Sequence, residues 1–415
     1  MTATLLTGIG ELVTMAPLAH EQRTTGIVDA DLGRVNKAWI AVSDGKIEGF
    51  GSGKPPAAAA GYQTVDARGG LVMPGLVDAH THPIFAGARA NEFAMRAAGA
   101  TYQEIAAAGG GIRATMAATR AASDQELLDL VLGRLARART LGITTVEAKS
   151  GYGLSVPDEL RLLRILGAAR ARAAQTLSIT CLALHAASPE HPSRAAYVDA
   201  CVRELLPVVA SERLADAVDA FVEEGYFSVA ETAPYAAAAR DLGLAVRLHA
   251  DEFSDAGGAG AAAAWGAQSA DHLQFASDAG VKAMAQAGVT AVILPGTSLY
   301  TRIPFTQARR FADAGCAVAI ATDFNPGSCQ VDNLAMLATV AAAQSGVRLA
   351  EAVAATTFVA AHALGLSARK GALAVGYDAD LQIIDLPSIE AWLADFGRTA
   401  PSEVWCRGLR TATRA

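Results

Sequence analysis

From residue 72 onward, short apolar runs alternate with longer Ala-, Leu- and Arg-rich stretches of helical character. Eight of the short runs have the length and apolar content of buried strands. They comprise residues 72–78, 142–148, 178–184, 217–222, 245–248, 268–271, 290–294 and 317–322. Helical segments follow most of them, for example residues 124–140 and 157–173. Alternating strands and helices predict an α/β fold with a parallel sheet, and eight repeats predict a closed, TIM-like (β/α)8 barrel.

The two ends of the chain have a different pattern, in which apolar and polar positions alternate as in strands. Near the N-terminus, residues 39–43 and 46–50 flank Asp44-Gly45, a dipeptide typical of a type I′ hairpin turn. Near the C-terminus, apolar runs occupy residues 380–385 and 403–406. We therefore predict a small β-sandwich domain built from both termini, because the tail can return to pair with the first strands. The predicted boundaries are residues 1–70 and 365–415 for this domain and 71–364 for the barrel.

The composition indicates a soluble cytoplasmic protein. Apolar residues make up 52% of the 415 residues, and the net charge of −7 argues against a general nucleic-acid binder. The five cysteines are an odd number without C-x-x-C spacing, so neither a disulfide framework nor a thiolate zinc site is expected. The N-terminus lacks a signal-peptide pattern, and the Ala-rich stretch at residues 259–265 is too short to span a membrane.

Histidine and aspartate residues follow the ends of five of the eight predicted strands. They are His80 and His82 after the first strand, His185, His249, His272 and Asp323. Active sites of (β/α)8 barrels lie at the C-terminal ends of the strands. The sequence therefore predicts that these side chains meet in one site.

The residue types and spacing in this group predict a metal centre. His80 and His82 are separated by one residue, so in an extended segment both imidazoles project to the same side. His249 adds a third nitrogen and Asp323 a carboxylate oxygen. Three nitrogens, one oxygen and an open position are typical of a catalytic zinc or iron site rather than a closed structural one.

Sequence motifs around these residues are similar to those of a known family. They are residues 80–89 (HTHPIFAGAR), 108–112 (AGGGI), 149–154 (KSGYGL), 249–252 (HADE) and 321–328 (ATDFNPGS). The placement of the ligands resembles the amidohydrolase superfamily, and the motifs together resemble the imidazolonepropionase family over essentially the full chain. This resemblance implies a hydrolase that opens the ring of 4-imidazolone-5-propanoate to give N-formimino-L-glutamate in histidine degradation.

The resemblance also implies roles for individual residues. The metal ligands would be His80, His82, His249 and Asp323, and the catalytic residues Glu252, His272 and Asp323. The substrate-binding residues would be Arg89, Tyr102, Tyr152, His185, Glu252, Asn325, Gly327 and Ser328. A guanidinium fork from Arg89 suits the propionate arm, and Glu252, three residues after His249, can move a proton to the leaving ring nitrogen. The chain departs from the family around His185, where Leu182-Ala-Leu replaces a Gly-Ala type run.

We expect one divalent metal per chain, Zn²⁺ or iron as Fe²⁺/Fe³⁺. Many members of the superfamily bind two metals bridged by a carboxylated lysine at the end of strand four. Here the fourth predicted strand runs into Val222-Glu223-Glu224-Gly225, which contains no lysine. Lys149 follows the second strand and is expected to form an ion pair or to support other residues of the site rather than to react itself.

Several alternatives stay open from the sequence. Another amidohydrolase, such as a heterocyclic-base deaminase, would use His249 and Glu252 equally well, and a metal-free scaffold for protein association is the alternative from a different class. Arg89 could form a structural ion pair with Glu92, and His272 could be a hydrogen-bonded core residue. The expected partner is a small-molecule substrate, with no nucleic acid and no membrane, and a homodimer would be ordinary for an enzyme of this size.

Overall fold

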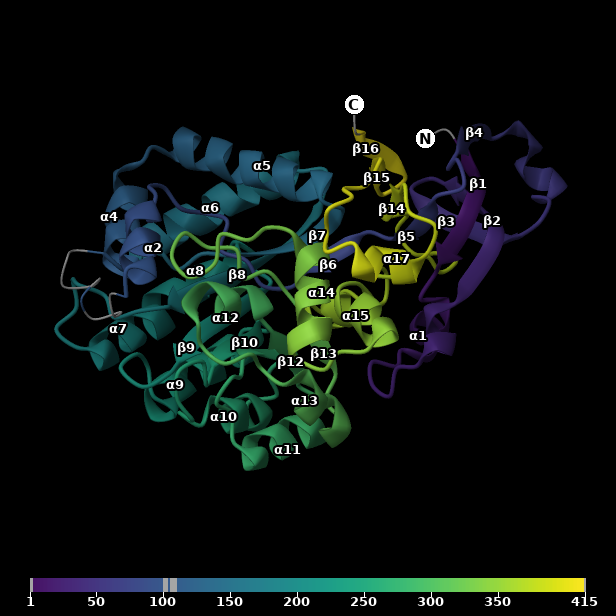
Figure 1. Ribbon diagram of the computed structural model, residues 1–415. Coiled ribbons are helices and arrows are strands. Elements are labelled where there is room, and N and C mark those ends of the chain that lie inside the picture. The colour runs from purple at the N-terminus through teal and green to yellow at the C-terminus, as the bar shows by residue number, and fades with distance from the viewer. Residues whose placement is uncertain (1–2, 100–103, 105–109, 414–415) are drawn as a thin grey trace.

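The computed structural model describes residues 3–99, 104 and 110–413, and its larger part is a barrel of parallel strands surrounded by helices (Figure 1). Neighbouring strands follow the chain order from β6 to β13. They are β6 (Leu76–Asp78), β7 (Ile143–Lys149), β8 (Thr176–Leu184), β9 (Ala217–Val222), β10 (Ala245–Ala250), β11 (Ser269–His272), β12 (Thr290–Ile293) and β13 (Val318–Ile320). The predicted (β/α)8 architecture is confirmed.

The barrel closes through backbone contacts just beyond β6 and β13. The Asp323 N–H donates to the His80 carbonyl at 3.0 Å, and the His82 N–H donates to the Phe324 carbonyl at 2.9 Å. These bonds join the first and last strands where both end. As a result, the H-x-H motif and Asp323 lie side by side at the C-terminal rim of the barrel.

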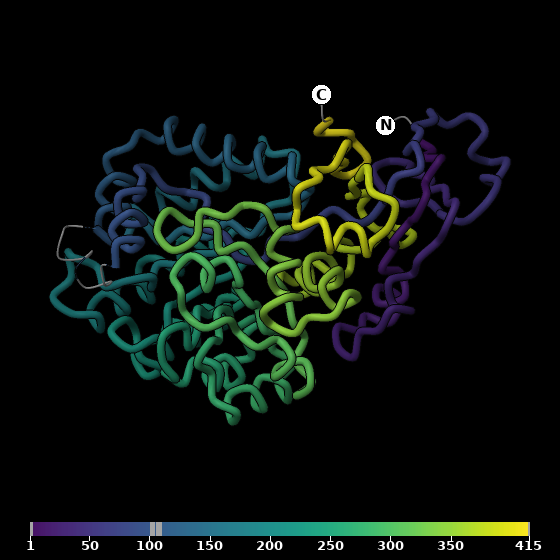
Figure 2. Tube along the Cα trace, in the orientation of Figure 1, coloured from purple at the N-terminus to yellow at the C-terminus, as the bar shows by residue number. Residues whose placement is uncertain are grey.

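Strands from both ends of the chain form a second sheet beside the barrel (Figures 1 and 2). Its order is β16-β15-β14-β5-β1-β2-β3, with β4 paired to β1, so the hydrogen bonding runs through one continuous sheet. The strands are β1 (Thr4–Val13), β2 (Arg34–Ser43), β3 (Lys46–Ser52), β4 (Gln63–Asp66), β5 (Leu71–Pro74), β14 (Leu381–Ile384), β15 (Glu403–Cys406) and β16 (Leu409–Thr413). The return of the tail to the N-terminal strands is thus confirmed, and the turn between β2 and β3 has the positive φ of a type I′ hairpin at Asp44 (49°) and Gly45 (77°).

The first predicted barrel strand, residues 72–78, is divided in the structure. Its first part is β5, which pairs with β14 and β1 in the small sheet, and only β6 belongs to the barrel. The division falls at Gly75, where a Cβ would lie 2.3 Å from the Thr144 side chain. A continuous apolar run therefore serves two sheets, a distinction that periodicity alone does not reveal.

Helices cover the outside of the barrel and flank the small sheet (Figure 1). They are α1 (Ala16–Glu21), α2 (Ala90–Ala97), α4 (Ile112–Ala121), α5 (Asp124–Thr140), α6 (Val156–Arg172), α7 (Arg194–Ala200), α8 (Leu206–Ser211), α9 (Val229–Asp241), α10 (Gly258–Ala264), α11 (Asp278–Ala287), α12 (Pro295–Thr301), α13 (Ala308–Ala314), α14 (Leu334–Gln344), α15 (Leu349–Ala355), α16 (Phe358–Ala363) and α17 (Ile389–Ala394). Ser123, Ser155 and Ser228 accept backbone N–H groups at the starts of α5, α6 and α9. Within the part of the chain that the structure describes, no helix is both long and apolar enough to cross a bilayer.

Candidate metal centre and active site

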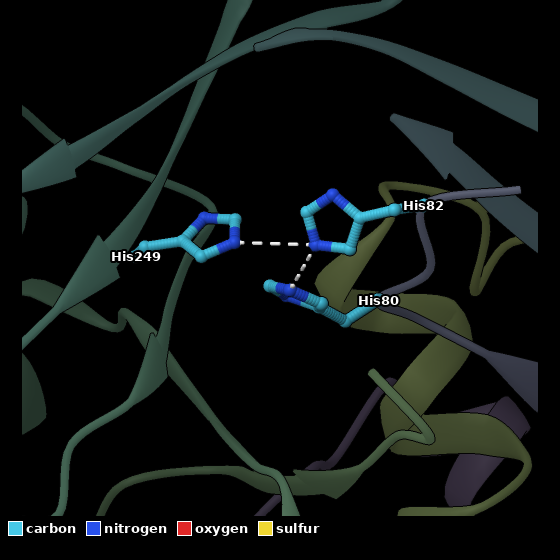
Figure 3. Close-up of side chains that lie close together, drawn as sticks. All are labelled: His80, His82 and His249. Carbon is cyan, nitrogen blue, oxygen red and sulfur yellow. Dashed lines mark hydrogen bonds between the residues drawn. The ribbon is translucent and has the colours of Figure 1, made fainter. Parts of the chain in front are cut away.

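Three histidines converge at the C-terminal rim of the barrel (Figure 3). The Nε2 atoms of His80 and His82 lie 3.3 Å apart, and the Nε2 atoms of His82 and His249 lie 3.4 Å apart. All three side chains are buried. The intervening Thr81 turns away and donates its hydroxyl to the Glu147 carbonyl, as the alternation of an extended segment predicts.

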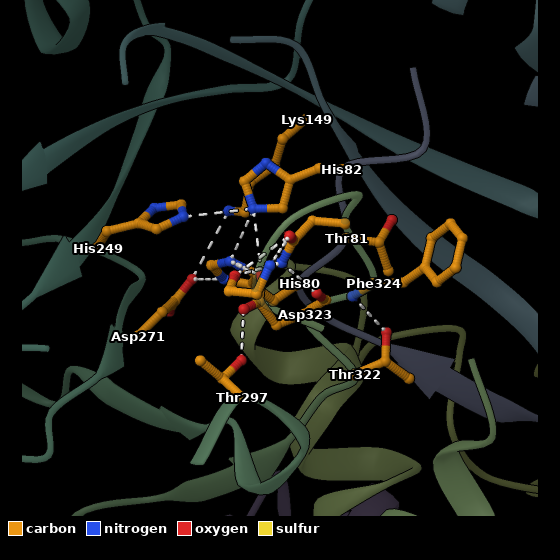
Figure 4. Close-up of polar contacts among 12 residues, drawn as sticks. His80, Thr81, His82, Lys149, His249, Asp271, Thr297, Thr322, Asp323 and Phe324 are labelled. Atoms are coloured by element: carbon orange, nitrogen blue, oxygen red, sulfur yellow. Dashed lines mark hydrogen bonds and ion pairs between the residues drawn. The ribbon is translucent and has the colours of Figure 1, made fainter. Parts of the chain in front are cut away.

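Asp323 completes this group with an oxygen (Figure 4). Its Oδ1 atom lies 3.5 Å from His80 Nε2 and 3.4 Å from His82 Nε2, while its Oδ2 atom accepts the Thr297 hydroxyl. His272 lies close by, because one of its ring nitrogens is within 4.8 Å of ligand atoms of His80 and Asp323. The four residues predicted as metal ligands are therefore brought together, with His272 beside them.

The protonation of these groups suits a divalent cation. Burial, together with the charges of Lys149 and His249, holds the pKa of His80 well below its usual value, and burial also lowers the pKa of His82. Burial alone would raise the pKa of Asp323, but hydrogen bonds with His80 and His82 hold it well below its ordinary value. Neutral imidazoles and an ionised carboxylate are the forms that bind metal, so this donor set fits a zinc- or iron-type ion.

Two buried aspartates fix the orientation of the histidine rings, and the sequence-based prediction did not include them. Asp271 Oδ2 lies 2.6 Å from His80 Nδ1, and Asp219 Oδ2 lies 2.9 Å from His249 Nδ1. When Nδ1 carries the proton, the Nε2 lone pair is free to face a metal. For Asp219 the sequence does contain a clue, because a charged residue in the middle of the apolar strand β9 needs a buried partner.

A cavity of about 820 Å³ opens above the histidine cluster, and Glu252 lines it. Glu252 Oε1 lies 3.7 Å from His272 Nδ1, and its side chain is buried. Burial, the charge of Asp323 and that of Glu223 raise the pKa of Glu252 well above its ordinary value. A protonated carboxyl group next to an ionised one can act as an acid, so the position of Glu252 agrees with the catalytic role expected for it.

The cavity is also lined by Arg89, which forms the ion pair with Glu92 that was the alternative interpretation. Arg89 Nε and Nη2 donate to the two carboxylate oxygens of Glu92 at 2.8 and 2.7 Å, and the Gly111 N–H donates to the same carboxylate. Arg89 Nη1 lies against Gly327, where a Cβ would be only 2.0 Å away. The ion pair therefore holds the guanidinium at the cavity wall and leaves Nη1 outside the carboxylate contact.

The other expected substrate-binding residues lie around the same cavity, with one exception. Tyr152, His185, Asn325, Gly327 and Ser328 all line it. Tyr102 lies outside the residues that the structure describes. The Asn325 side chain accepts the N–H groups of Gly327 and Ser328, so the loop after β13 is held by its own members.

The end of β9 carries no lysine and serves a different purpose. Glu223 Oε2 accepts the Phe253 N–H at 2.8 Å, and its Oε1 accepts the Glu224 N–H at 2.8 Å. Glu223 thus anchors the loop that carries Glu252.

Three residues that follow barrel strands or end them, Asp251 (φ 52°), His272 (76°) and Asp323 (52°), adopt left-handed backbone conformations. Such conformations cost energy in residues other than glycine and cluster at functional sites.

Comparison with known proteins identifies relatives over nearly the whole chain. A family model described as the amidohydrolase family matches residues 63–120 and 105–410. Imidazolonepropionase from Symbiobacterium thermophilum is 46% identical over 92% of this chain and 91% of its own length. Imidazolonepropionase from Deinococcus deserti is 42% identical over 99% of this chain and 100% of its own.

Solved structures with lower identity share the fold. An adenosine deaminase from Xanthomonas campestris with bound zinc has a TM-score of 0.72 at 20% identity and covers 99% of this chain and 93% of that chain. An atrazine chlorohydrolase from Arthrobacter aurescens complexed with zinc has a TM-score of 0.74 at 17% identity, over 99% and 95% of the two chains. At these identities the likeness shows the fold alone, whereas the curated relatives show the family. The chain belongs to the imidazolonepropionase family of the amidohydrolase superfamily.

Proposed function

We propose that the chain hydrolyses the cyclic amide of 4-imidazolone-5-propanoate to N-formimino-L-glutamate. The observation that carries this proposal is the convergence of His80, His82, His249 and Asp323 at a cavity that is lined by the last three of them and by Glu252 and Arg89. A buried acid, a group of metal donors and a guanidinium together match a ring carbonyl, a leaving nitrogen and a carboxylate arm. The family relationship supports the same substrate.

His80, His82, His249 and Asp323 would hold one divalent ion, zinc or iron. When bound, such an ion supplies Lewis-acid chemistry, because it lowers the pKa of water from about 15.7 towards roughly 7 and polarises a carbonyl. Asp271 and Asp219 support the site by accepting from the Nδ1 atoms of His80 and His249. Glu223 is occupied by backbone N–H groups, which supports a single ion rather than a bridged pair.

The protein groups divide the proton transfers between them. Asp323, which stays ionised, accepts a proton from the attacking water as the water oxygen bonds to the ring carbonyl carbon. Glu252, which holds its proton because its pKa is raised, donates that proton to the ring nitrogen as the amide C–N bond breaks. The neutral imidazole of His272, whose pKa is lowered to about 3 by burial, has one N–H that can donate to the developing oxyanion.

Arg89 would bind the propionate carboxylate through Nη1, while Glu92 fixes the rest of its guanidinium. Tyr152 and His185 also line the cavity, and the His185 ring stacks on His82 at 5.2 Å between centroids. Asn325, Gly327 and Ser328 add polar groups from the loop after β13. We also assign substrate binding to Tyr102.

The proposal is tested by incubating metal-loaded protein with freshly generated 4-imidazolone-5-propanoate and following N-formimino-L-glutamate by mass spectrometry. A blank corrects for spontaneous decay of the substrate, and a chelated sample tests for the metal. We expect product to appear far faster than in the blank, and without release of ammonia. Product formation at the rate of the blank would exclude this substrate, and early ammonia release would indicate deamination instead.

A further inference from the structure

A lysine lies beneath the candidate metal centre, inside the barrel. Lys149 is the last residue of β7, and its side chain is fully buried. Its Nζ atom lies 2.7 Å from Asp219 Oδ2, 3.6 Å from Asp271 Oδ2 and 2.8 Å from Glu147 Oε2. Figure 4 shows Lys149 and Asp271 next to the histidines. Three carboxylates thus surround one ammonium group.

The same oxygen of each aspartate faces both the lysine and a histidine. Asp219 Oδ2 contacts Lys149 Nζ and His249 Nδ1, and Asp271 Oδ2 contacts Lys149 Nζ and His80 Nδ1. The Lys149 ammonium donates to Asp219 Oδ2 and forms a longer ion pair with Asp271 Oδ2, and a positive charge beside a carboxyl group favours its ionised form, which only accepts. A carboxylate held as an acceptor in turn requires the histidine to carry its proton on Nδ1.

We infer that Lys149 is a positioning residue for the metal centre. Its ammonium group holds Asp219 and Asp271 as acceptors, so that His249 and His80 carry their protons on Nδ1 and direct their Nε2 lone pairs towards one ion. The inference rests on the metal site of the proposed function, and it assigns to Lys149 an action through Asp219 and Asp271. One lysine thereby sets the tautomers of two ligands, one in the segment after β6 and one on β10.

The surroundings of Lys149 argue against a reactive or bridging role for it. Burial alone would lower its pKa, but the charges of Asp219, Glu147 and Asp271 raise it above the usual value, so the side chain stays an ammonium ion. An ammonium ion has no lone pair for nucleophilic attack or for carboxylation. Arg247 supplies a second buried cation by donating to Glu147 at 2.6 Å, so Glu147 is shared between the two cations while Asp219 and Asp271 face the Lys149 ammonium.

The experiment compares Lys149→Met with Lys370→Met in protein freed of metal. Lys370 is a matched control, because it is equally buried and lies 2.9 Å from Asp378, but it belongs to the region of the small sheet. Zinc affinity is measured by competition with a chromophoric chelator, and the ligand geometry by the visible absorption of bound Co²⁺. Circular dichroism confirms that each variant is folded.

We expect Lys149→Met to weaken zinc binding by about 10–100-fold and to change the Co²⁺ spectrum, as loss of other outer-sphere partners does. Lys370→Met should bind zinc within about twofold of the parent protein. Unchanged affinity and spectrum in folded Lys149→Met, or equal loss in both variants, would overturn the inference. A parent protein that binds no zinc or iron would instead overturn the proposed function.

If Lys149→Met does not fold, Asp271→Asn and Asp219→Asn test the same network with little change of shape. An amide can present a donor to the imidazole, so each change should also weaken zinc binding by about 10–100-fold. Parent-like zinc affinity and Co²⁺ spectra in both folded variants would contradict the inference.

Discussion

At the scale of single residues, two carboxyl groups of the site have pKa values displaced in opposite directions. Burial and the charges of Asp323 and Glu223 raise the pKa of Glu252, whereas hydrogen bonds with His80 and His82 hold that of Asp323 well below its ordinary value. Groups whose pKa values are separated in this way can act as acid and base in one reaction. In the proposed reaction, Asp323 is therefore the base and Glu252 the acid.

Glu252→Gln should lower kcat by about 10²–10⁴-fold, because the amide cannot deliver a proton to the leaving nitrogen. The metal content should not change, since Glu252 is not among the four converging donors. Steady-state kinetics and elemental analysis measure both quantities. Glu224→Gln is the control, because Glu224 lines the same cavity but is exposed. Equal rates for the two variants would remove Glu252 from the mechanism.

Arg89→Met should raise KM by about 10–100-fold, since a hydrogen bond to a charged group contributes about 1.5–3 kcal/mol. Glu92→Gln separates carboxylate binding from support of the loop, because it weakens the ion pair but keeps the guanidinium. We expect the second variant to change KM far less than the first. If both raise KM equally, Arg89 acts through the loop and not on the substrate. Initial rates over a range of substrate concentrations give both constants.

The residues at strand ends could be predicted from the sequence, because the barrel topology brings them to one rim. The roles of Asp219 and Asp271 could not be predicted, because these residues act through His249 and His80, which are distant from them in the chain. The Arg89–Glu92 pair was foreseen only as an alternative to substrate binding. The structure shows that the ion pair and a position in the cavity wall exist together.

At the scale of secondary structure, the chain passes from the small sheet to the barrel at Gly75, whose backbone lies close to the Thr144 side chain. The Gly75 N–H donates to the Asp380 carbonyl of the tail, and the Leu76 N–H donates to the Gly142 carbonyl of the barrel. The chain changes sheets within these two residues. Strand positions in the barrel were predicted well because both faces of each strand are buried, whereas this change of sheet was not.

Gly75→Ala should lower the free energy of unfolding by about 1–3 kcal/mol, because its Cβ would lie 2.3 Å from the Thr144 side chain. Gly133→Ala is the control. A Cβ at Gly133 meets nothing within 4 Å, and alanine favours a helix by up to about 1 kcal/mol. Denaturant unfolding measures the stability of both variants. A Gly75→Ala protein as stable as the parent would show that the space between Gly75 and Thr144 accommodates a methyl group, which would contradict the prediction.

At the scale of the whole molecule, ion pairs join the two ends of the chain. Arg34 of β2 contacts Glu390 of α17 at 2.6 Å and the buried Glu11 of β1 at 2.7 Å. Apolar residues from both ends share one core, among them Leu6, Ile40, Leu381 and Trp405. The pairing of the two ends was predictable from their strand-like pattern, but the partner of each strand was not, because register depends on tertiary contacts.

The Arg34–Glu390 contact predicts a pH dependence of stability. A hydrogen bond from Arg34 lowers the pKa of Glu390 to about 2, below its unfolded value of about 4.3. A lowered carboxyl pKa contributes stability above about pH 4.3, and this contribution is lost as the pH falls towards 2. Because Glu390 is 51% exposed, we expect less than about 1 kcal/mol. Denaturation of Glu390→Gln and the parent should differ at pH 7 and converge in acid, and a gap independent of pH would contradict this.

The central claim is that one metal ion at His80, His82, His249 and Asp323 activates the hydrolysis, and a metal titration tests it most directly. Chelated protein is titrated with Zn²⁺ or Fe²⁺ while formation of N-formimino-L-glutamate is followed. The account predicts no activity above the blank without metal and a linear rise that ends at one ion per chain. Activity in the absence of metal, or a rise that continues to two ions per chain, would contradict it.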